Sequence, residues 1–241
     1  MINIKHAALG DVVPTKRFEE IRSVPLFSQT SDESFNALVR GAYVQNFPPH
    51  TELITEGESA DFLHIVASGS IELFSSWAGR ETCMTFLGAH STFILAATIK
   101  DRPYLMSART LTKSRVIMIP SEDIRDVFQR DAEFAKSIVS ELASCYRESV
   151  KNSKNVKLRT SVERLANYLV KHHDRAGGNG KVVLGVEKKK LASFLGMTPE
   201  NLSRAFSALK SHGVEVAGQT ILVTDAADLE AFARPDVLID D

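Results

Sequence analysis

The stretch KKKLASFLGMTPENLSRAFSALKSHGV, residues 188–214, predicts a helix, a tight turn and a second helix. The first helix is expected over about Glu187–Leu195. Gly196 should end it, because glycine readily adopts the positive φ of a C-terminal helix cap. Thr198 can cap the second helix, and Pro199 suits its first turn. Together these signals indicate a helix-turn-helix.

The second helix has one apolar face and one polar face. Its apolar residues recur at i, i+3, i+4 and i+7, which predicts a buried face of Leu202, Ala205, Phe206 and Leu209. The opposite face carries Glu200, Ser203, Arg204 and Ser207. Such a helix can lie in the major groove of DNA with its polar side chains against base edges. The alternative is a pair of packed surface helices in any small α-helical domain.

The distribution of charge favours DNA binding, although the net charge of −1 does not. Residues 157–212 contain 11 Lys or Arg and 4 Asp or Glu, whereas residues 213–241 contain 1 and 7. The positive excess therefore coincides with the helix-turn-helix, where Lys188, Lys189 and Lys190 can contact phosphates.

The composition is that of an ordinary globular protein, with 44% hydrophobic and 24% charged residues. Two cysteines, Cys83 and Cys145, are too few for a disulfide framework or a four-cysteine metal site. No apolar run approaches the roughly 18 residues of a membrane span, and no signal-peptide core is present. A cytoplasmic protein without membrane contact is expected.

The first predicted domain, residues 1–130, combines short helices with a β-barrel. Residues 1–17 read as an arm, and short helices are expected over Phe18–Val24 and Ser31–Arg40. Short apolar runs separated by turn residues then predict a sandwich or jelly-roll barrel. The runs begin at Tyr43, Glu52, Phe62, Ser70, Cys83, Ser91, Leu105 and Ser114. Ser121 is expected to cap a further helix.

Residues 131–156 are predicted to form one long helix that ends in a hinge at Lys151–Asn155. Near-heptad spacing places Phe134, Ile138, Leu142 and Cys145 along one side, which favours a coiled coil between two copies. The alternative is that this seam packs on the barrel.

Residues 157–241 complete the predicted DNA-binding domain. A helix is expected over Ser161–His173, a strand over Lys181–Val186, a hairpin from Val214 to Val223, and a last helix over Asp225–Phe232. A hairpin after a helix-turn-helix is the wing of a winged helix. The overall fold class is α+β: a jelly-roll barrel, a dimerisation helix and a winged helix-turn-helix.

This order of elements resembles the Crp/Fnr superfamily of bacterial transcription regulators, over about residues 18–232. Three stretches carry the resemblance. Gly57–Ile71 (GESADFLHIVASGSI) is similar to the family's barrel signature, Pro120–Ile124 (PSEDI) to the start of its short helix, and Gly196–Arg204 (GMTPENLSR) to its recognition helix.

The resemblance implies that Glu200, Ser203 and Arg204 read bases. A carboxylate accepts from cytosine N4, and an arginine fork donates to guanine O6 and N7. This form of the helix is similar to the Fnr branch, which implies double-stranded DNA with a TTG-containing inverted repeat. It also implies a homodimer and RNA polymerase as partners. Pro199 departs from the family pattern and lacks a backbone donor.

The effector site departs from the cyclic-nucleotide members of the family. Within Ser91–Arg109, Phe93-Ile94-Leu95 replaces a Gly-Glu pair and Met106-Ser107 replaces Arg-Ser. A buried phosphate would lack compensation, so no cyclic nucleotide is expected. An iron–sulfur cluster needs four cysteines and is excluded.

The apolar pocket and the recognition helix look most like the nitric-oxide-responsive Nnr and Dnr regulators of denitrification, which implies haem as a cofactor. Haem needs an apolar cavity and an axial ligand. His64 and His90 are the first candidates, beside Phe93 and Met106 of the expected pocket; His50 and Cys83 are weaker. The alternative is a structural role, which is the more frequent one for a lone histidine in a strand, and no metal ligand set is assigned. His172 and His173 are expected to be solvated.

Two kinds of regulator and one class of enzyme are the alternative functions for such a chain. The favoured function is an activator of denitrification genes that responds to nitric oxide. The alternative regulator binds another small ligand or none and is controlled by its expression level. An enzyme on the barrel is not expected, because the chain has no His-x-His pair for a cupin-type metal site.

Overall fold

The computed structural model describes residues 19–240, so the predicted arm at residues 1–17 lies outside the described residues. The chain divides into two compact units, the first ending at Ser144 and the second beginning at Cys145. Within residues 19–240, no helix combines the length and the apolar character that a membrane crossing requires.

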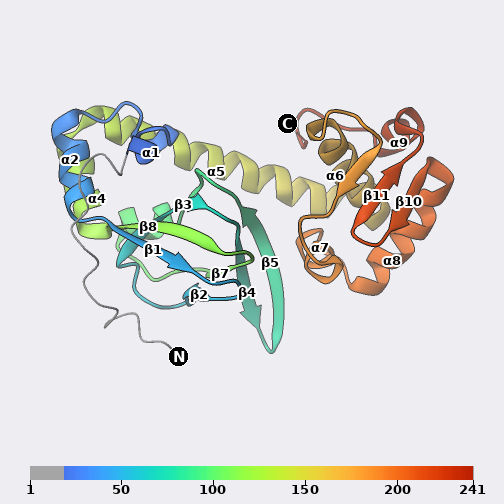
Figure 1. Cartoon of the computed structure of the whole chain (residues 1–241), viewed down its shortest axis with the longest axis horizontal. Coiled ribbons are helices and arrows are strands. Elements are labelled where there is room, and N and C mark those ends of the chain that lie inside the picture. Colours follow the sequence, from blue (N-terminus) through green and yellow to red (C-terminus); the bar gives the residue numbers. More distant parts are fainter. Residues whose placement is uncertain (1–18, 241) are drawn as a thin grey trace. The chain divides into compact units, whose positions relative to one another are not determined.

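The first unit contains two four-stranded antiparallel sheets (Figure 1). One has the strand order β1-β8-β3-β6 and the other β2-β7-β4-β5. The predicted jelly-roll barrel is confirmed. The strands are β1 (Tyr43–Phe47), β2 (Glu52–Ile54), β3 (Phe62–Ser68), β4 (Ile71–Trp77), β5 (Arg80–Leu87), β6 (Thr92–Phe93), β7 (Ser107–Thr110) and β8 (Ser114–Pro120).

Helices cover the outer face of the first sheet and create a second apolar layer. Along β3, Leu63 and Ile65 face the helices, whereas Val66 faces the other sheet, as the period-2 geometry of a strand requires. His64, two residues before Val66, faces the same side and lies in the inter-sheet core. The helices of this unit are α1 (Glu19–Arg22), the 3-10 turn η3 (Pro25–Phe27), α2 (Asp32–Arg40), α3 (Leu95–Lys100), α4 (Ser121–Arg130) and the first part of α5 (Ala132–Leu158).

Two predictions for this unit were wrong in detail. The run Ser91–Leu95 was expected to be a strand, but the chain turns at Ile94, which has φ of 69°, and α3 follows. A left-handed conformation is unfavourable for a β-branched residue, so apolar periodicity could not reveal this turn. Ser121 is the first residue of α4, and Pro120 occupies the N-cap.

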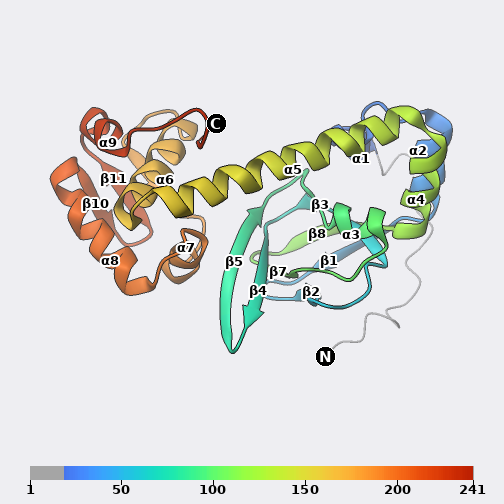
Figure 2. The same ribbon diagram turned by 180° about the vertical axis from the view of Figure 1, so that it is seen from behind.

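Helix α5 continues without a break through Lys151–Asn155, where a hinge was predicted (Figures 1 and 2). Asp131 starts the helix: its Oδ1 accepts from the N–H of Phe134 at 3.0 Å, and its Oδ2 accepts from the Ser31 hydroxyl at 2.7 Å. The Phe134 bond, followed by the bonds from Ser31, holds the pKa of Asp131 well below its usual range. The helix ends at Leu158, and the chain bends at residues 159–160.

The second unit is a winged helix-turn-helix, as predicted. Its three-stranded sheet has the order β10-β11-β9, and β10 and β11 form the wing hairpin. One apolar core joins the sheet to all its helices. The elements are α6 (Ser161–Arg175), β9 (Lys181–Val183), α7 (Lys188–Phe194), α8 (Pro199–Ala208), the 3-10 turn η4 (Leu209–His212), β10 (Val214–Ala217), β11 (Thr220–Val223) and α9 (Ala226–Ala233).

Candidate nucleic-acid interface and effector barrel

The turn between α7 and α8 has the geometry that the sequence predicts. Gly196 has φ of 64°, and the Thr198 hydroxyl accepts from the N–H of Asn201 at 3.3 Å. Pro199 occupies the first helical turn, where its missing N–H removes no intrahelical bond. Leu202 and Phe206 are buried. Helix α8 is therefore fixed by its cap and its apolar face.

The polar face of α8 is fully presented to solvent. Glu200, Ser203, Arg204 and Ser207 are all exposed. Hydrogen bonds from its own backbone N–H and from the Thr198 hydroxyl lower the pKa of Glu200, so its carboxylate is ionised at neutral pH. Glu200 thus offers a hydrogen-bond acceptor, and Arg204, four residues further on, offers a guanidinium fork on the same face of the helix. Both groups suit the readout of base edges.

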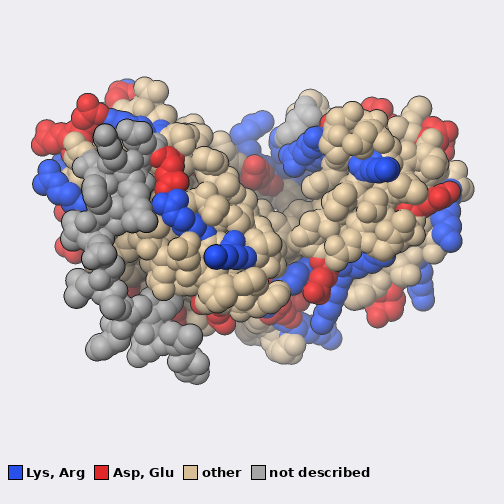
Figure 3. All heavy atoms as spheres, viewed as in Figure 1, with Lys and Arg blue, Asp and Glu red and all other residues tan. Residues whose placement is uncertain are grey.

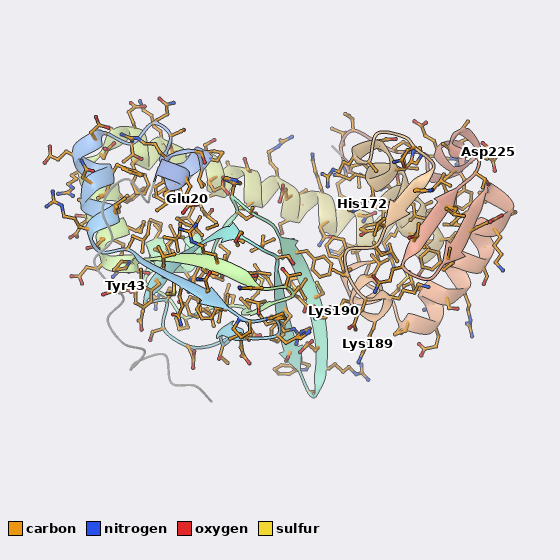
Figure 4. The ribbon with its side chains drawn as sticks, viewed as in Figure 1. Glu20, Tyr43, His172, Lys189, Lys190 and Asp225 are labelled. Carbon is orange, nitrogen blue, oxygen red and sulfur yellow. The ribbon has the colours of Figure 1, made fainter. Side chains whose placement is uncertain are left out.

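Three lysines occupy the first turn of α7, which has no acidic residue. Cations at a helix N-terminus oppose the helix dipole, so the charges of Lys188, Lys189 and Lys190 are unfavourable to α7 in this respect. Figure 4 shows Lys189 and Lys190 on this helix, and Figure 3 shows Lys and Arg side chains with some acids along the same edge of the unit. Cations gathered in this way are of the kind that contacts nucleic-acid phosphates.

A cleft of about 250 Å³ lies between α8, the start of α7 and the wing. Its floor is apolar, and Lys188 and Lys210 contribute cations to its lining. The Lys188 ammonium also lies 5.9 Å from the centre of the Phe206 ring. The sequence did not single out Lys210; its place four residues after Phe206 on the same helical stripe was the available signal. The complete lining is Lys188, Pro199, Leu202, Ser203, Phe206, Ser207, Lys210 and Val216.

Arg164 joins the end of α5 to the turn of the helix-turn-helix. Its Nη1 donates to the carbonyl oxygens of Val156 at 3.1 Å and Arg159 at 2.8 Å, and its Nη2 donates to that of Gly196 at 3.2 Å. The residue is 8% exposed, and burial lowers the pKa of its guanidinium. The sequence gives no signal for this role, because an arginine within an amphipathic helix usually faces solvent.

The structure argues against two of the predicted dimer contacts. Phe134 and Ile138 are 0% and 1% exposed, and both belong to the core that α5 shares with the barrel's helices. Leu142 is half-buried against the same core. Cys145 is exposed further along this side. The first part of the predicted seam therefore packs on the chain's own barrel, which was the alternative interpretation.

A second seam on α5 is exposed. Val139, Ala143, Tyr146 and Val150 follow a 4-3-4 spacing, which is the a/d pattern of a coiled coil. Val139 is 61% exposed and Tyr146 is 72% exposed. Ile138, Leu142 and Cys145 of the first pattern each lie one residue before Val139, Ala143 and Tyr146 of the second, so periodicity alone could not decide which pattern faces the barrel.

His64 lies on β3 between the two sheets of the barrel. Its ring is 3% exposed and stacks on Phe93 with 4.9 Å between ring centroids, while Tyr104 approaches edge-on at 6.5 Å. Burial lowers the pKa of His64 to about 4, so the imidazole is neutral at pH 7. Its Nδ1 is buried without a hydrogen-bond partner within the described part of the chain.

The other candidate ligands are not gathered around His64. His90 and His50 are exposed residues with φ of 67° and 62°. Met106 is half-buried against the inter-sheet core, and Cys83 is buried on β5. Across residues 19–240, no cluster of three or more His, Cys, Asp or Glu could hold a metal ion.

The packing around His64 does not fit a haem in this arrangement. A neutral imidazole with an unpaired nitrogen is a suitable iron ligand, but His64 Nδ1 is enclosed by the barrel, so a haem could reach it only if the surrounding side chains moved. The cyclic-nucleotide positions supply no cation either. Leu95 is buried, and the Ser107 hydroxyl accepts from the N–H of Glu56 at 2.9 Å.

The prediction that His172 and His173 are both solvated was wrong for His173. That side chain is buried, and its Nε2 accepts from the N–H of Gly180 at 3.2 Å. His172 is half-buried and lies against Tyr168, with ring centroids 4.1 Å apart. Both histidines therefore have structural roles in the second unit.

The comparisons with known proteins agree with this architecture. The chain matches the cyclic nucleotide-binding domain family over residues 44–131 and the Crp-like helix-turn-helix domain family over residues 163–232. It is 23% identical over 215 residues to a CRP-like cAMP-activated global transcriptional regulator of Mycobacterium tuberculosis, covering 87% of this chain and 96% of that protein.

Two solved structures have the same fold. A regulatory protein from Silicibacter pomeroyi is 28% identical with a TM-score of 0.60, over 90% of this chain and 100% of that chain. A Crp/Fnr-family protein from Eubacterium rectale is 18% identical with a TM-score of 0.71, over 88% and 98%.

A sensor-type barrel followed by a winged helix-turn-helix defines a DNA-binding transcription regulator. The chain belongs to the Crp/Fnr family. Members of this family regulate transcription, so the expectation that the chain is not an enzyme is confirmed.

Proposed function

We propose that this protein is a cytoplasmic homodimer that binds a TTG-containing inverted repeat and activates transcription with RNA polymerase. The observation that carries the DNA-reading part is the exposed face of α8, where Glu200, Ser203 and Arg204 project from a helix fixed by its cap and its apolar side. Lysines on α7 and Lys210 would add contacts to phosphates.

Dimerisation is proposed through the exposed seam of α5. Tyr146 and Val139 are large apolar residues that single chains seldom leave this exposed in a regular repeat. Pairing two copies along Val139, Ala143, Tyr146 and Val150 would bury them as coiled-coil knobs. It would also supply the second recognition helix that an inverted repeat needs.

The barrel is proposed to sense nitric oxide or another nitrogen oxide and so to control denitrification genes. Two observations favour a small uncharged ligand over a cyclic nucleotide. The family's charged positions hold Leu95 and Met106, and the inter-sheet core around the neutral His64 consists mostly of apolar side chains. His64 is the only one of the predicted ligands placed at the centre of that core.

The experiment is a titration of purified protein onto a duplex with a TTG inverted repeat, with and without nitric oxide. Tight binding that nitric oxide changes supports both parts of the proposal. Binding that no added ligand changes would leave the regulator and reject the nitric-oxide response. Failure to bind any such repeat would reject the DNA site itself.

A second candidate is a Crp/Fnr regulator that binds another ligand or none. The close His64–Phe93 stack favours this candidate, because the two buried rings occupy space between the sheets that an effector would need. An absorbance spectrum with added haem separates the two. A Soret band that is lost in His64→Phe supports haem sensing, and its absence favours this second candidate. Calorimetry with cyclic AMP and cyclic GMP checks the nucleotide alternative.

A further inference from the structure

The corner between α5 and α6 attaches the winged helix-turn-helix to the long helix. It consists of residues 159–160 alone, since α5 ends at Leu158 and α6 begins at Ser161. Thr160 and Glu163 form a capping box that fixes the start of α6. The remaining freedom of the corner lies in the angle at which the two helices meet.

The segment 236–240, which follows α9, contacts this corner and the helices beside it. Arg159 Nη1 and Nη2 donate to Asp240 Oδ1 and Oδ2, both at 2.6 Å, in a bidentate pair. The Arg159 side chain is only 9% exposed, and Nη1 also donates to the Asn155 amide oxygen at 3.2 Å. Arg159 therefore connects the last turns of α5 to the segment. Bidentate arginine–carboxylate pairs are geometrically specific.

Two lysines attach the same segment to both helices. Lys154 on α5 donates through Nζ to the Leu238 carbonyl at 3.2 Å, and Lys171 on α6 donates to the Asp240 carbonyl at 2.5 Å. The segment also holds its own shape, because the N–H of Asp236 donates to Asp240 Oδ2 at 2.7 Å. One short segment thus contacts the helices on both sides of the corner.

Polar contacts rather than apolar burial hold the segment. Of its three apolar side chains, Val237 and Leu238 are 64% and 63% exposed, and only Ile239 is half-buried. Burial alone would raise the pKa of Asp240, but the bonds from Arg159 and Asp236 lower it overall. Removing the Asp240 charge should therefore release the segment without opening the apolar core of the unit.

We propose that residues 236–240 form a clasp that fixes the α5–α6 angle, so that the paired recognition helices accept only one half-site spacing. The clasp rests on the proposed dimeric DNA binding. Each base pair inserted between half-sites moves one of them by about 3.4 Å and rotates it by about 34°. A fixed corner cannot follow that displacement, whereas a released corner can. Arg159 and Asp240 are thus specificity-determining for spacing.

The test compares wild type, Asp240→Asn, Arg159→Gln and the charge-swapped pair Arg159→Asp with Asp240→Arg. Glu230→Gln, an exposed acid on α9, is the matched control. Affinity is measured on inverted repeats whose half-site centres lie one helical turn apart, and on repeats with one base pair added or removed between the half-sites. Wild type and the control should prefer the one-turn spacing by about tenfold or more, and the two single variants should prefer it by about twofold. The swapped pair should recover part of the preference.

A merely stabilising role would lower affinity equally at all spacings, and that result would overturn the clasp. Amide hydrogen exchange of residues 155–162 gives a second measure without DNA. It should accelerate in Asp240→Asn and not in Glu230→Gln, and unchanged exchange would also overturn the proposal. If wild type bound no repeat, the proposed function would fail while the exchange experiment still decided the clasp.

Discussion

The Nη2 of Arg164 lies 3.2 Å from the carbonyl oxygen of Gly196, so α6 is tied directly to the turn of the helix-turn-helix. The same guanidinium bonds the carbonyls that end α5. The described residues give this buried cation no acidic partner; carbonyl oxygens at a helix C-terminus, the negative end of its dipole, compensate it instead. One side chain therefore relates the long helix to the element that reads DNA.

Arg164→Met should destabilise the second unit by about 2–4 kcal/mol, because the buried carbonyls lose their donor. Arg164→Lys should recover only part of this loss, since one ammonium cannot replace the fork. Urea denaturation measures the effect. Arg175→Met, at the exposed end of the same helix, is the control and should change stability by less than about 0.5 kcal/mol. Equal effects of Arg164→Met and its control would contradict the assignment.

The exposed seam on α5 predicts that Tyr146→Glu makes the protein monomeric. A charge at the centre of a coiled-coil seam should raise the dimer dissociation constant by about tenfold or more, without changing the stability of the barrel. Analytical ultracentrifugation measures the association.

Ile138→Ala should have the opposite pattern. It should lower the free energy of unfolding of the first unit by about 2–5 kcal/mol through a cavity, with the dimer retained. A monomeric Ile138→Ala with unchanged stability would instead restore the seam first predicted from the sequence.

The stability of the barrel should fall between about pH 6.5 and pH 4. The pKa of His64 is about 4 in the folded protein and 6.5 in the unfolded chain, so the unfolded chain binds the extra proton in this window. Folding stability then decreases as pH falls, by at most about 3 kcal/mol across the window. The depressed pKa of Asp131 acts separately, below its ordinary value of 3.8.

Denaturation of His64→Phe at a series of pH values measures this contribution. The slope between pH 6.5 and pH 4 should flatten relative to wild type. An unchanged slope would show that His64 is already charged or solvated in the folded barrel.

Lys189→Ala and Arg204→Ala should weaken DNA binding in different ways. Loss of a phosphate contact should lower affinity for all sequences and reduce the salt slope by about 1. Loss of Arg204 should cost about 1–3 kcal/mol on the specific repeat and relax discrimination at one base pair. Binding curves at several salt concentrations, on specific and scrambled duplexes, separate the two. Identical behaviour of the variants would contradict the assigned roles.

Local signals sufficed wherever one residue type decided the backbone. Gly196, Thr198 and Pro199 specified the turn, and the short apolar runs between turn residues specified the sandwich. Local signals failed where the same apolar periodicity was compatible with two ways of packing a helix. Phe134 and Val139 begin overlapping repeats on α5, and only tertiary packing selects which repeat faces the barrel.

The remaining failures concern residues whose chemistry is ambiguous in sequence. Ile94 gave no turn signal, because β-branched residues seldom adopt positive φ. His64 and His90 looked equivalent, yet one is enclosed by aromatic rings and the other is exposed on a turn. The buried arginine and the clasp depend on contacts between residues far apart in the chain, for which periodicity has no signal.

The most direct test of the central claim is fluorescence anisotropy of the wild-type protein on a TTG inverted repeat and on a scrambled duplex of equal length. The salt concentration of the buffer is kept near the physiological value. Specific binding should be tighter by about 10³-fold or more, and Arg204→Ala should lose much of that preference. Equal affinity of the wild-type protein for both duplexes would contradict the account.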